Sequence, residues 1–418
     1  MINYIENRNK IFNVIDDNSI VILHSGYDQH KSADAVRKYE VNKNFYYLTG
    51  ICQKDVKLVL VKMGETRQSW LFIDAIDEVM AKWVGRTLTK EEAKEISNVD
   101  IVYYNDQFES VVSSLYQPTR HFAYSAGKVY LDLEVARIPL YNTFGLDYAK
   151  RLSKVYPSVE VKNIYHNIVE ARMQKEDGEI EEICKSIETT KNAIYNVMKH
   201  HEELDNESLA TAYHDFVLIH EDKRNSFENI IASGKNATVL HYDSNNSPIE
   251  KDSLLLMDVG CYTNWYSSDI TRTFPVSGKF TPKQKEIYEI VLETNKKCIE
   301  YAKHGVTWKD INDYAKSLLA SGLKKMGLIK EDSELIKYYF HSIGHSLGLD
   351  VHDPSIYAKG LVEGMVITIE PGLYVEELGI GIRIEDNVLI TKDGCINLSK
   401  DIIKEIDDIE EFMKNNNL

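Results

Sequence analysis

Short apolar runs that alternate with polar, helix-like segments fill the first 165 residues. Three of these runs have the length and β-branched content of buried strands, at 19–26, 56–63 and 69–74. Residues 88–97 predict a helix, because Thr89 can cap the first turn and Glu92 follows three residues later. The aromatic run 45–47 predicts a further buried strand. Strands that alternate with helices in this way predict an α/β domain over residues 1–165.

The rest of the chain alternates long amphipathic helices with strand-rich segments. Apolar residues at helical spacing predict four helices, at 177–201, 207–221, 281–305 and 307–327. Strands predominate after the second helix and again after the fourth. Because two helices followed by strands occur twice, this half is predicted to be an α+β domain over residues 166–418. Residues 157–173 are expected to form the hinge between the two domains.

Composition narrows the class of protein. A chain of 418 residues exceeds one ordinary hydrophobic core and predicts two or three domains. The formal net charge of −16 argues against a nucleic-acid partner, since a phosphate binder needs a broad basic surface. No stretch approaches the ~20 apolar residues of a membrane helix, and no signal peptide is evident. The five cysteines are scattered and form no CxxC motif, which predicts a reduced, cytoplasmic protein.

Residues 341–353, HSIGHSLGLDVHD, concentrate candidate chemistry. His341, His345 and His352 stand among small and aliphatic residues that a solvated loop would not need. A plain core strand, in turn, would not accommodate three imidazoles. Two interpretations of this stretch remain open: a buried polar site, or a loop whose histidines are simply hydrogen-bonded in the core.

A pair of aspartates favours the first interpretation. Asp258 ends the apolar segment 253–260, and Asp269 lies inside the next predicted strand. If Thr263 and Asn264 form a two-residue loop, the two aspartates stand directly opposite on one face, roughly 4.5–5.5 Å apart between Cβ atoms. Two like charges so placed destabilise a sheet unless a divalent metal or a shared proton lies between them.

A pair of glutamates follows. Glu370 ends the alternating strand 365–372, and Glu385 lies inside the predicted strand 379–391. Buried charges among β-branched residues are costly unless they pair or bind a metal. Arg383 shares a strand face with Glu385 and can pair with one of these carboxylates.

Together these residues predict a dinuclear metal site. Four carboxylates and one imidazole are too many ligands for one ion, but they suit two ions about 3.5–4 Å apart. The donors are mostly oxygen with one nitrogen, which favours two Mn²⁺ ions, with Co²⁺ or Zn²⁺ as possible substitutes.

The same segments resemble a known family. HSIGHSLGLDVHD, MDVG, SSDITRTFPVSGKFT, TIEPGLY and GIGIRIEDNVLIT resemble the signature segments of the pita-bread metallopeptidases of the aminopeptidase P and prolidase group. Near the N-terminus, KSADAVRKYEVNKNFYYLTG and WVGR resemble the creatinase-like domain of bacterial aminopeptidase P. The resemblance spans essentially the whole chain. It implies an α/β N-terminal creatinase-like domain (1–165) and an α+β C-terminal pita-bread catalytic domain (166–418).

The resemblance also implies roles for individual residues. The positions that bind the two metals in the family correspond to Asp258, Asp269, His345, Glu370 and Glu385. Positions near the substrate and the scissile carbonyl correspond to His241 and His352, with Glu370 as general base. Supporting positions correspond to His341 and Arg383. Two residues of the first half are expected to reach the site of a neighbouring subunit in a homodimer or a dimer of dimers, namely Asp34 and Trp83.

Three functions are compatible with this site. The first is an exopeptidase that removes the N-terminal residue from peptides with proline in second position. The second is a prolidase, which cleaves only Xaa-Pro dipeptides. The third is a non-catalytic binding member of the fold. The complete ligand set argues against the third, and the N-terminal segments favour the first.

Overall fold

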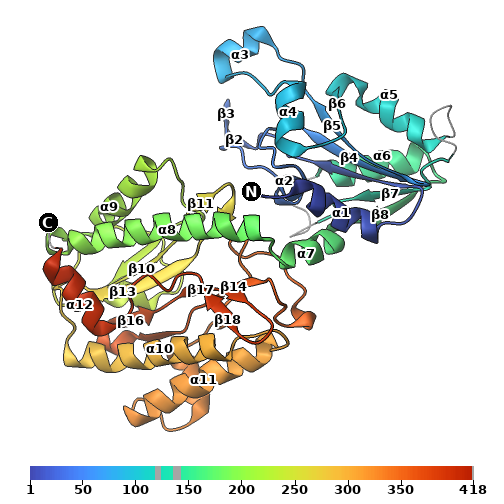
Figure 1. Ribbon diagram of the computed structural model, residues 1–418. Helices are drawn as coiled ribbons and strands as arrows, with labels where there is room; N and C mark the ends of the chain where they lie inside the picture. The colour runs from blue at the N-terminus through green and yellow to red at the C-terminus, as the bar shows by residue number, and fades with distance from the viewer. Residues whose placement is uncertain (118–123, 135–142, 417–418) are drawn as a thin grey trace. The chain divides into compact units, whose positions relative to one another are not determined.

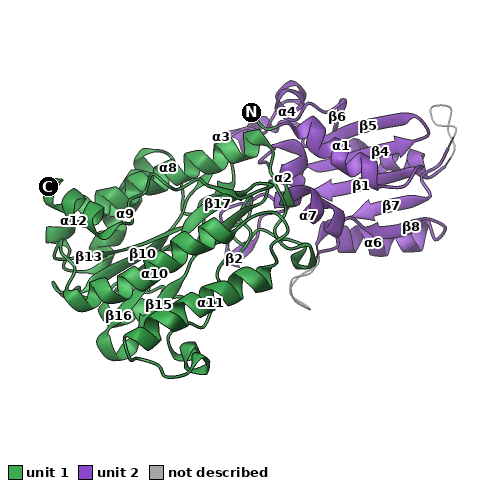
Figure 2. Ribbon diagram, turned by 60° about the horizontal axis from the view of Figure 1, so that its bottom comes forward, with its two compact units in different colours: residues 1–2, 173–418 green, residues 3–172 purple. Residues whose placement is uncertain are grey.

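The computed structural model describes residues 1–117, 124–134 and 143–416. It divides into two compact units, which comprise residues 3–172 and residues 1–2 with 173–418 (Figure 2). The predicted domain boundary after residue 165 falls within helix α7 (Tyr165–Met173), which belongs to the N-terminal unit up to Arg172. None of the described helices combines the length and apolar character that crossing a membrane requires.

The N-terminal unit is built around a six-stranded mixed sheet of order β6-β5-β4-β1-β7-β8. Its strands are β1 (Ser19–His24), β4 (Lys57–Met63), β5 (Thr66–Ile73), β6 (Ile101–Tyr104), β7 (Lys128–Leu131) and β8 (Glu160–Asn163). The three predicted strands correspond to β1, β4 and β5. The described helices of this unit are α1 (Tyr4–Val14), α2 (Lys43–Thr49), α3 (Glu78–Val84), α4 (Lys90–Ser97), α5 (Phe108–Ser113), α6 (Phe144–Val155) and α7. A short hairpin adds β2 (His30–Ser32) and β3 (Ala35–Val36).

Local capping decides two elements of this unit. The predicted capping box of α4 is confirmed: the Thr89 side chain accepts from the Glu92 N–H, and the Glu92 side chain accepts from the Thr89 N–H. The predicted strand at 45–47 is wrong, because these residues lie in helix α2. Asn42 caps its start by accepting from the Phe45 N–H, and Gly50 ends it with a left-handed φ of 68°. The two caps outweigh the strand preference of the aromatic side chains.

The C-terminal unit repeats two helices followed by strands. The first set contains α8 (Asp177–Lys199), α9 (Glu207–His220), β9 (Ile230–Ser233), β10 (Leu254–Val259), β11 (Tyr262–Thr263), β12 (Tyr266–Ser267) and β13 (Ile270–Pro275). The second contains α10 (Pro282–Tyr301), α11 (Trp308–Lys325), β14 (Val366–Ile369), β15 (Gly372–Val375), β16 (Ile380–Arg383), β17 (Asp386–Ile390) and β18 (Cys395–Asn397). Helix α12 (Ile406–Asn415) follows. Helix α8 contacts β11–β13, whereas α10 contacts β14–β16 and β18, so the strands lie between these helices (Figure 1).

The hairpin that carries the two aspartates has a different register from the predicted one. Its two-residue turn is Asn264–Trp265, with φ of 48° and 67°, and Thr263 pairs with Tyr266. Positive φ at both turn positions matches the twist of a two-residue hairpin. The turn therefore lies one residue later, and Asp258 stands opposite Thr271 instead of Asp269. Asp269 directly precedes β13, two residues before the partner of Asp258.

The predicted single strand at 379–391 is in fact two strands. β16 pairs with β15, whereas β17 pairs with β14 and β18. Glu385 lies between them, so its predicted place inside a strand is wrong. The Ile384 N–H donates to the Pro371 carbonyl at 3.2 Å, and the Glu385 N–H donates to the Thr271 carbonyl at 3.0 Å. The chain thus changes sheets at Glu385, where its backbone is tied to the neighbouring hairpin.

The packing of this hairpin can be tested by a substitution at Gly260. A Cβ at Gly260 would collide with the Ser268 carbonyl oxygen and lie 2.6 Å from Ser226 Oγ. We expect Gly260→Ala to lower the free energy of unfolding by about 1–3 kcal/mol, because neither neighbour can move without shifting the hairpin. The control is Gly394→Ala, since a Cβ there meets no atom within 4 Å. Urea unfolding of both variants measures the difference, and equal stabilities would contradict this account of the hairpin.

Candidate metal centre

The structure brings the five predicted ligands together in the C-terminal unit. The ligand atoms of one group, His345, Glu370 and Glu385, lie within 4.8 Å of one another. A second group with the same spacing comprises Asp258, Asp269 and Glu385. Glu385 belongs to both groups. Two ligand sets that share one carboxylate can hold two adjacent divalent ions.

The four candidate carboxylate ligands stand where strands begin or end. Asp258 lies near the end of β10, Asp269 precedes β13, and Glu370 follows β14. Glu385 occupies the break between β16 and β17. The loop of His345 is tied to β14, because the His345 N–H donates to Thr368 Oγ1 at 3.0 Å. Residues from different sheets thus converge on one point.

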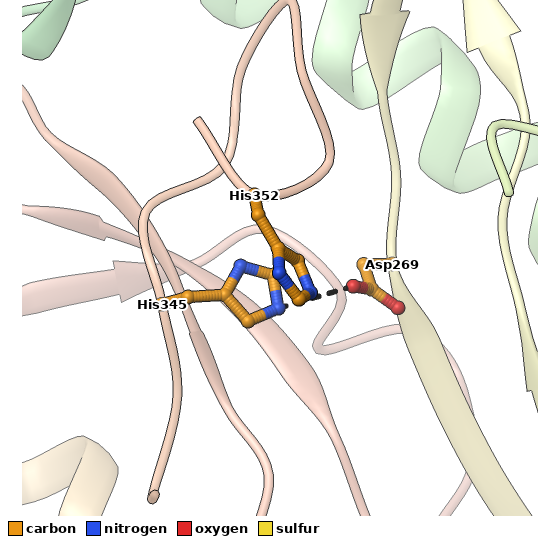
Figure 3. Close-up of side chains that lie close together, drawn as sticks. All are labelled: Asp269, His345 and His352. Atoms are coloured by element: carbon orange, nitrogen blue, oxygen red, sulfur yellow. Dashed lines mark ion pairs between the residues drawn. The ribbon is translucent and has the colours of Figure 1, made fainter. Parts of the chain in front are cut away.

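The imidazole of His345 faces two of the carboxylates. Its Nε2 lies 3.3 Å from Asp269 Oδ2, as Figure 3 shows, and 3.7 Å from Glu370 Oε1. Its Nδ1 lies 3.1 Å from the Ser346 carbonyl oxygen. A proton on Nδ1 satisfies that carbonyl and leaves Nε2 free to act as a ligand, which is the usual arrangement around metal-binding histidines.

Burial changes the protonation of this cluster. It raises the pKa of Asp269 to about 6 and that of Glu370 to about 7. Burial and the neighbouring Asp269 raise the pKa of Glu385 well above its ordinary value. Burial lowers the pKa of His345, but the hydrogen bond and charge of Asp269 outweigh it and raise the pKa to about 9. The carboxylates therefore cannot all ionise without added positive charge.

The donor set fits divalent cations. Asp258 Oδ1 is buried and accepts no hydrogen bond from any residue the structure describes. An unpaired buried acceptor is costly unless a cation or another donor meets it. Oxygen donors in excess over one imidazole nitrogen suit hard or borderline ions such as Mn²⁺, Co²⁺ and Zn²⁺.

A buried arginine compensates one side of the cluster. Arg383 Nη2 donates to Asp258 Oδ2, so its ion-pair partner is this aspartate and not one of the two glutamates that the sequence analysis proposed. Arg383 Nη1 donates to the Tyr374 hydroxyl at 2.9 Å, and this hydroxyl lies 2.8 Å from His341 Nε2. Burial, and next the charge of Arg383, lowers the pKa of His341 to about 4. His341 Nδ1 in turn lies 3.8 Å from Glu370 Oε2.

Of the two histidines predicted near the substrate, His352 belongs to a third group of close side chains, with Asp269 and His345. The ring of His352 is centred 4.0 Å from that of His345, and Figure 3 shows both rings on the same side of Asp269. Partial burial, and next the charge of His345, lowers the pKa of His352 to about 4. His241 is exposed and lies within electrostatic range of His341 and His352.

Asp34 and Trp83 are not part of the cluster. Both belong to the N-terminal unit and are exposed, and the side chain of Trp83 is 81% accessible. Their contribution to a neighbouring subunit's site stays a prediction.

Supporting residues were missed by the sequence analysis. Asn387 brackets Asp269: its Nδ2 donates to the Asp269 carbonyl at 2.6 Å, and its Oδ1 accepts from the Asp269 N–H at 3.2 Å. Thr271 Oγ1 donates to Glu385 Oε2 at 2.7 Å. Tyr374 links Arg383 to His341. The available signal was their position inside the same motif segments as the ligands.

The sequence matches agree with this geometry. Residues 181–392, which carry the whole cluster, match metallopeptidase family M24. The chain belongs to metallopeptidase family M24. Residues 4–124 match the N-terminal domain of aminopeptidase P. These matches confirm the predicted family and the predicted order of an aminopeptidase P N-terminal domain and a pita-bread domain.

Related M24 proteins align along nearly the whole chain. The Xaa-Pro aminopeptidase of Haemophilus influenzae is 32% identical and covers 98% of this chain and 96% of its own length. The mitochondrial intermediate cleaving peptidase 55 of Arabidopsis thaliana is 31% identical and covers 99% and 83%, respectively.

Solved structures of M24 proteins share the fold. One from Bacillus anthracis, provisionally assigned as an aminopeptidase P, superposes with a TM-score of 0.95 and 46% identity, covering 99% of this chain and 98% of its own. Aminopeptidase P of Escherichia coli gives a TM-score of 0.88 and 28% identity with the same coverage.

Metal should stabilise this M24 protein more as the pH rises. Protonated Asp269 and Glu370 favour the metal-free fold, because their pKa values are raised to about 6 and 7 from 3.8 and 4.5. That contribution is complete below about pH 4 and is lost as the pH rises through about 7, while metal binding requires the ionised forms. We expect the metal-induced rise in unfolding temperature to grow from about pH 5 to about pH 7.5. Calorimetry of metal-free and metal-saturated protein measures it, and a pH-independent rise would contradict the assigned ligands.

Proposed function

We propose that this chain is a Xaa-Pro aminopeptidase, a dinuclear metal-dependent exopeptidase that releases the N-terminal residue from peptides with proline second. The observation that carries the proposal is the pair of ligand groups joined at Glu385. Its support is the alignment with Xaa-Pro aminopeptidases over nearly the whole length of both chains.

The substrate class is supported by the chemistry of one structural neighbour. Aminopeptidase P of E. coli has been solved with the inhibitor Pro-Leu. A dipeptide that begins with proline is what remains when the first residue is removed from an Xaa-Pro-Leu peptide. The leaving nitrogen of proline carries no N–H in the substrate, so a site without an acceptor for that proton can favour it.

We propose two Mn²⁺ ions, with Co²⁺ or Zn²⁺ as possible substitutes. Asp258, Asp269, His345, Glu370 and Glu385 would hold them, as their spacing and donor types allow. The E. coli enzyme has also been solved in a zinc-substituted form with product. When bound, the ions would supply Lewis acidity, which lowers the pKa of a water molecule and polarises the scissile carbonyl.

Glu370 is the proposed general base. As a carboxylate within one ligand group, it can take a proton from water and return it to the proline nitrogen. His352 is neutral at neutral pH, since its pKa is about 4, and its imidazole N–H can donate to the oxyanion. His241 is the proposed substrate contact. His341 and Tyr374 hold Arg383, which in turn holds Asp258.

The oligomeric state and the cellular location of the enzyme are also proposals. We propose a homo-oligomer, a dimer or a tetramer, in which Asp34 and Trp83 approach a neighbouring subunit's site. Five free cysteines support a reducing, cytoplasmic location. The alternative activities are that of a prolidase restricted to dipeptides and a binding role without catalysis.

A peptide series separates the candidate activities. Metal-free protein reconstituted with Mn²⁺ should remove only X from X-Pro-Y, and should leave acetyl-X-Pro-Y intact because an amide nitrogen is a poor metal ligand. Replacing proline by alanine should lower kcat/KM by orders of magnitude, roughly 10²-fold or more. The alanine peptide matters because the Arabidopsis relative is named for intermediate cleavage instead of for proline.

Mass-spectrometric time courses on X-Pro, X-Pro-Y, acetyl-X-Pro-Y and X-Ala-Y give the result. Parallel reconstitution with Co²⁺ and Zn²⁺ ranks the ions. Turnover of X-Pro alone would identify a prolidase, and cleavage of the acetylated peptide would remove the exopeptidase proposal. No turnover with any ion would favour the binding role.

Two variants should distinguish the base from the oxyanion contact. Glu370→Gln should lower kcat by at least ~10², because it removes the proton carrier and one ligand charge together. His352→Ala should lower kcat by roughly 10²–10³ while the metal content stays at the wild-type level. Steady-state kinetics with elemental analysis measures both. Loss of metal from His352→Ala would show that His352 acts as a ligand instead.

A further inference from the structure

The loop that carries His241 is not held in place through the side chain of His241. The segment runs from the end of β9 to the start of β10 and includes a short 3-10 helix at Gly234–Thr238. The imidazole of His241 is exposed and makes no hydrogen bond with another described residue. Its position must therefore be set by the backbone on either side.

A buried carboxylate outside the metal centre holds both sides of this loop. Glu207 is the first residue of α9 and is 0% exposed. Its Oε1 accepts from the Ser233 N–H at 2.9 Å, from Ser233 Oγ at 3.0 Å and from Asn236 Nδ2 at 3.0 Å. Its Oε2 accepts from the Tyr242 hydroxyl at 2.7 Å and from the Ser247 N–H at 3.0 Å. These five donors lie before and after His241 in the chain.

All five donors are neutral. A fully buried carboxylate is costly unless donors satisfy it, and charge-assisted hydrogen bonds are about twice as strong as neutral ones. Glu207 belongs to none of the ligand groups among the described residues. Its charge is thus used to hold one segment, in addition to the backbone bond from the Glu207 N–H to the Ser247 carbonyl at 3.0 Å.

Tyr242 connects this anchor to His241. It is the next residue in the chain, and its ring packs against an apolar cluster of Ile230, Ala232, Ala237 and Leu256. Its hydroxyl reaches Glu207 and lies 3.1 Å from Ser247 Oγ. With Tyr242 fixed on the inner side, His241 is left on the exposed side, within electrostatic range of His341 and His352.

We propose that Glu207 is a positioning residue for the reaction, which fixes the loop 233–247 so that His241 meets the substrate in one orientation. The inference rests on the proposed function, since it takes His241 as the substrate contact. Misplacement of an orienting group by about 1 Å can cost a rate factor of roughly 10². Loosening the anchor should therefore reduce turnover without removing any group that touches the substrate.

The test is a double-mutant cycle on the Mn²⁺-loaded full-length protein. Tyr242→Phe removes a single donor, and Glu207→Gln keeps the volume but removes the charge. We expect kcat/KM for X-Pro-Y to fall by about 5- to 10-fold in Tyr242→Phe and by more in Glu207→Gln. In a His241→Ala background, the same changes should lower kcat/KM by less than about twofold, because residues that act through one group are not additive.

A matched control removes the same kind of bond elsewhere. The Tyr213 hydroxyl donates to Glu203 on the surface, so Tyr213→Phe should leave kcat/KM unchanged within about twofold. Hydrogen exchange should increase in residues 234–247 of Tyr242→Phe, with metal content and exchange elsewhere unchanged. Because Tyr242→Phe removes one hydroxyl alone, it keeps the test decisive even if Glu207→Gln does not fold.

The outcomes separate this inference from the proposed function. Undiminished losses in the His241→Ala background, or unchanged exchange in residues 234–247, would overturn the positioning role. A wild-type protein that fails to cleave X-Pro-Y would overturn the proposed function instead, whatever the exchange pattern. If the wild type prefers another peptide, the cycle is measured with that peptide and keeps its meaning.

Discussion

The C-terminal unit depends on one constraint: four carboxylates, two buried and two partly buried, cannot all be charged without added cations. Arg383 offsets Asp258, and His345 offsets Asp269, but no such partner faces Glu385 among the described ion pairs. Burial raises the pKa values of three of the carboxylates as a result. The fold thus holds a charge arrangement that becomes favourable only with a ligand, so binding energy and stability are linked.

Such an arrangement persists because a rigid scaffold surrounds it. Asn387 brackets the backbone of Asp269, and Arg272 Nη1 donates to the Glu385 carbonyl at 2.6 Å. Arg272 Nη2 also pairs with Asp386, whose second oxygen accepts from Lys404 at 2.6 Å. These contacts fix the candidate ligands within the fold, as preorganised metal sites require.

The sequence analysis correctly predicted those elements that depend on local sequence patterns. Apolar runs located β1, β4 and β5, and the Thr89 cap located α4. The types of residue in the motif segments identified four carboxylates and one imidazole as candidate ligands, and the family resemblance selected His345 among the three histidines. Three features differ from the prediction. Asn264 and Trp265 adopt left-handed backbone and shift the hairpin register, the chain changes sheets at Glu385, and the caps Asn42 and Gly50 turn an aromatic run into a helix. Supporting residues such as Asn387 and Glu207 become visible only when distant segments meet in the fold.

The C-terminal unit compensates the negative charge of its carboxylates in three ways. The way in which a carboxylate is compensated indicates whether it is available for chemistry. Asp386 is paired with Arg272 and Lys404; burial raises its pKa, but these two cations outweigh it and lower the pKa to about 2. Glu207 is satisfied by five neutral donors. The protein itself satisfies both carboxylates, so neither is left to bind a cation. The cluster around Glu385 is left short of positive charge, and a group that the protein itself does not neutralise is available to bind a cation and move a proton. Chemistry is therefore expected at the candidate metal centre, whereas Glu207 is proposed only to hold the loop that carries His241.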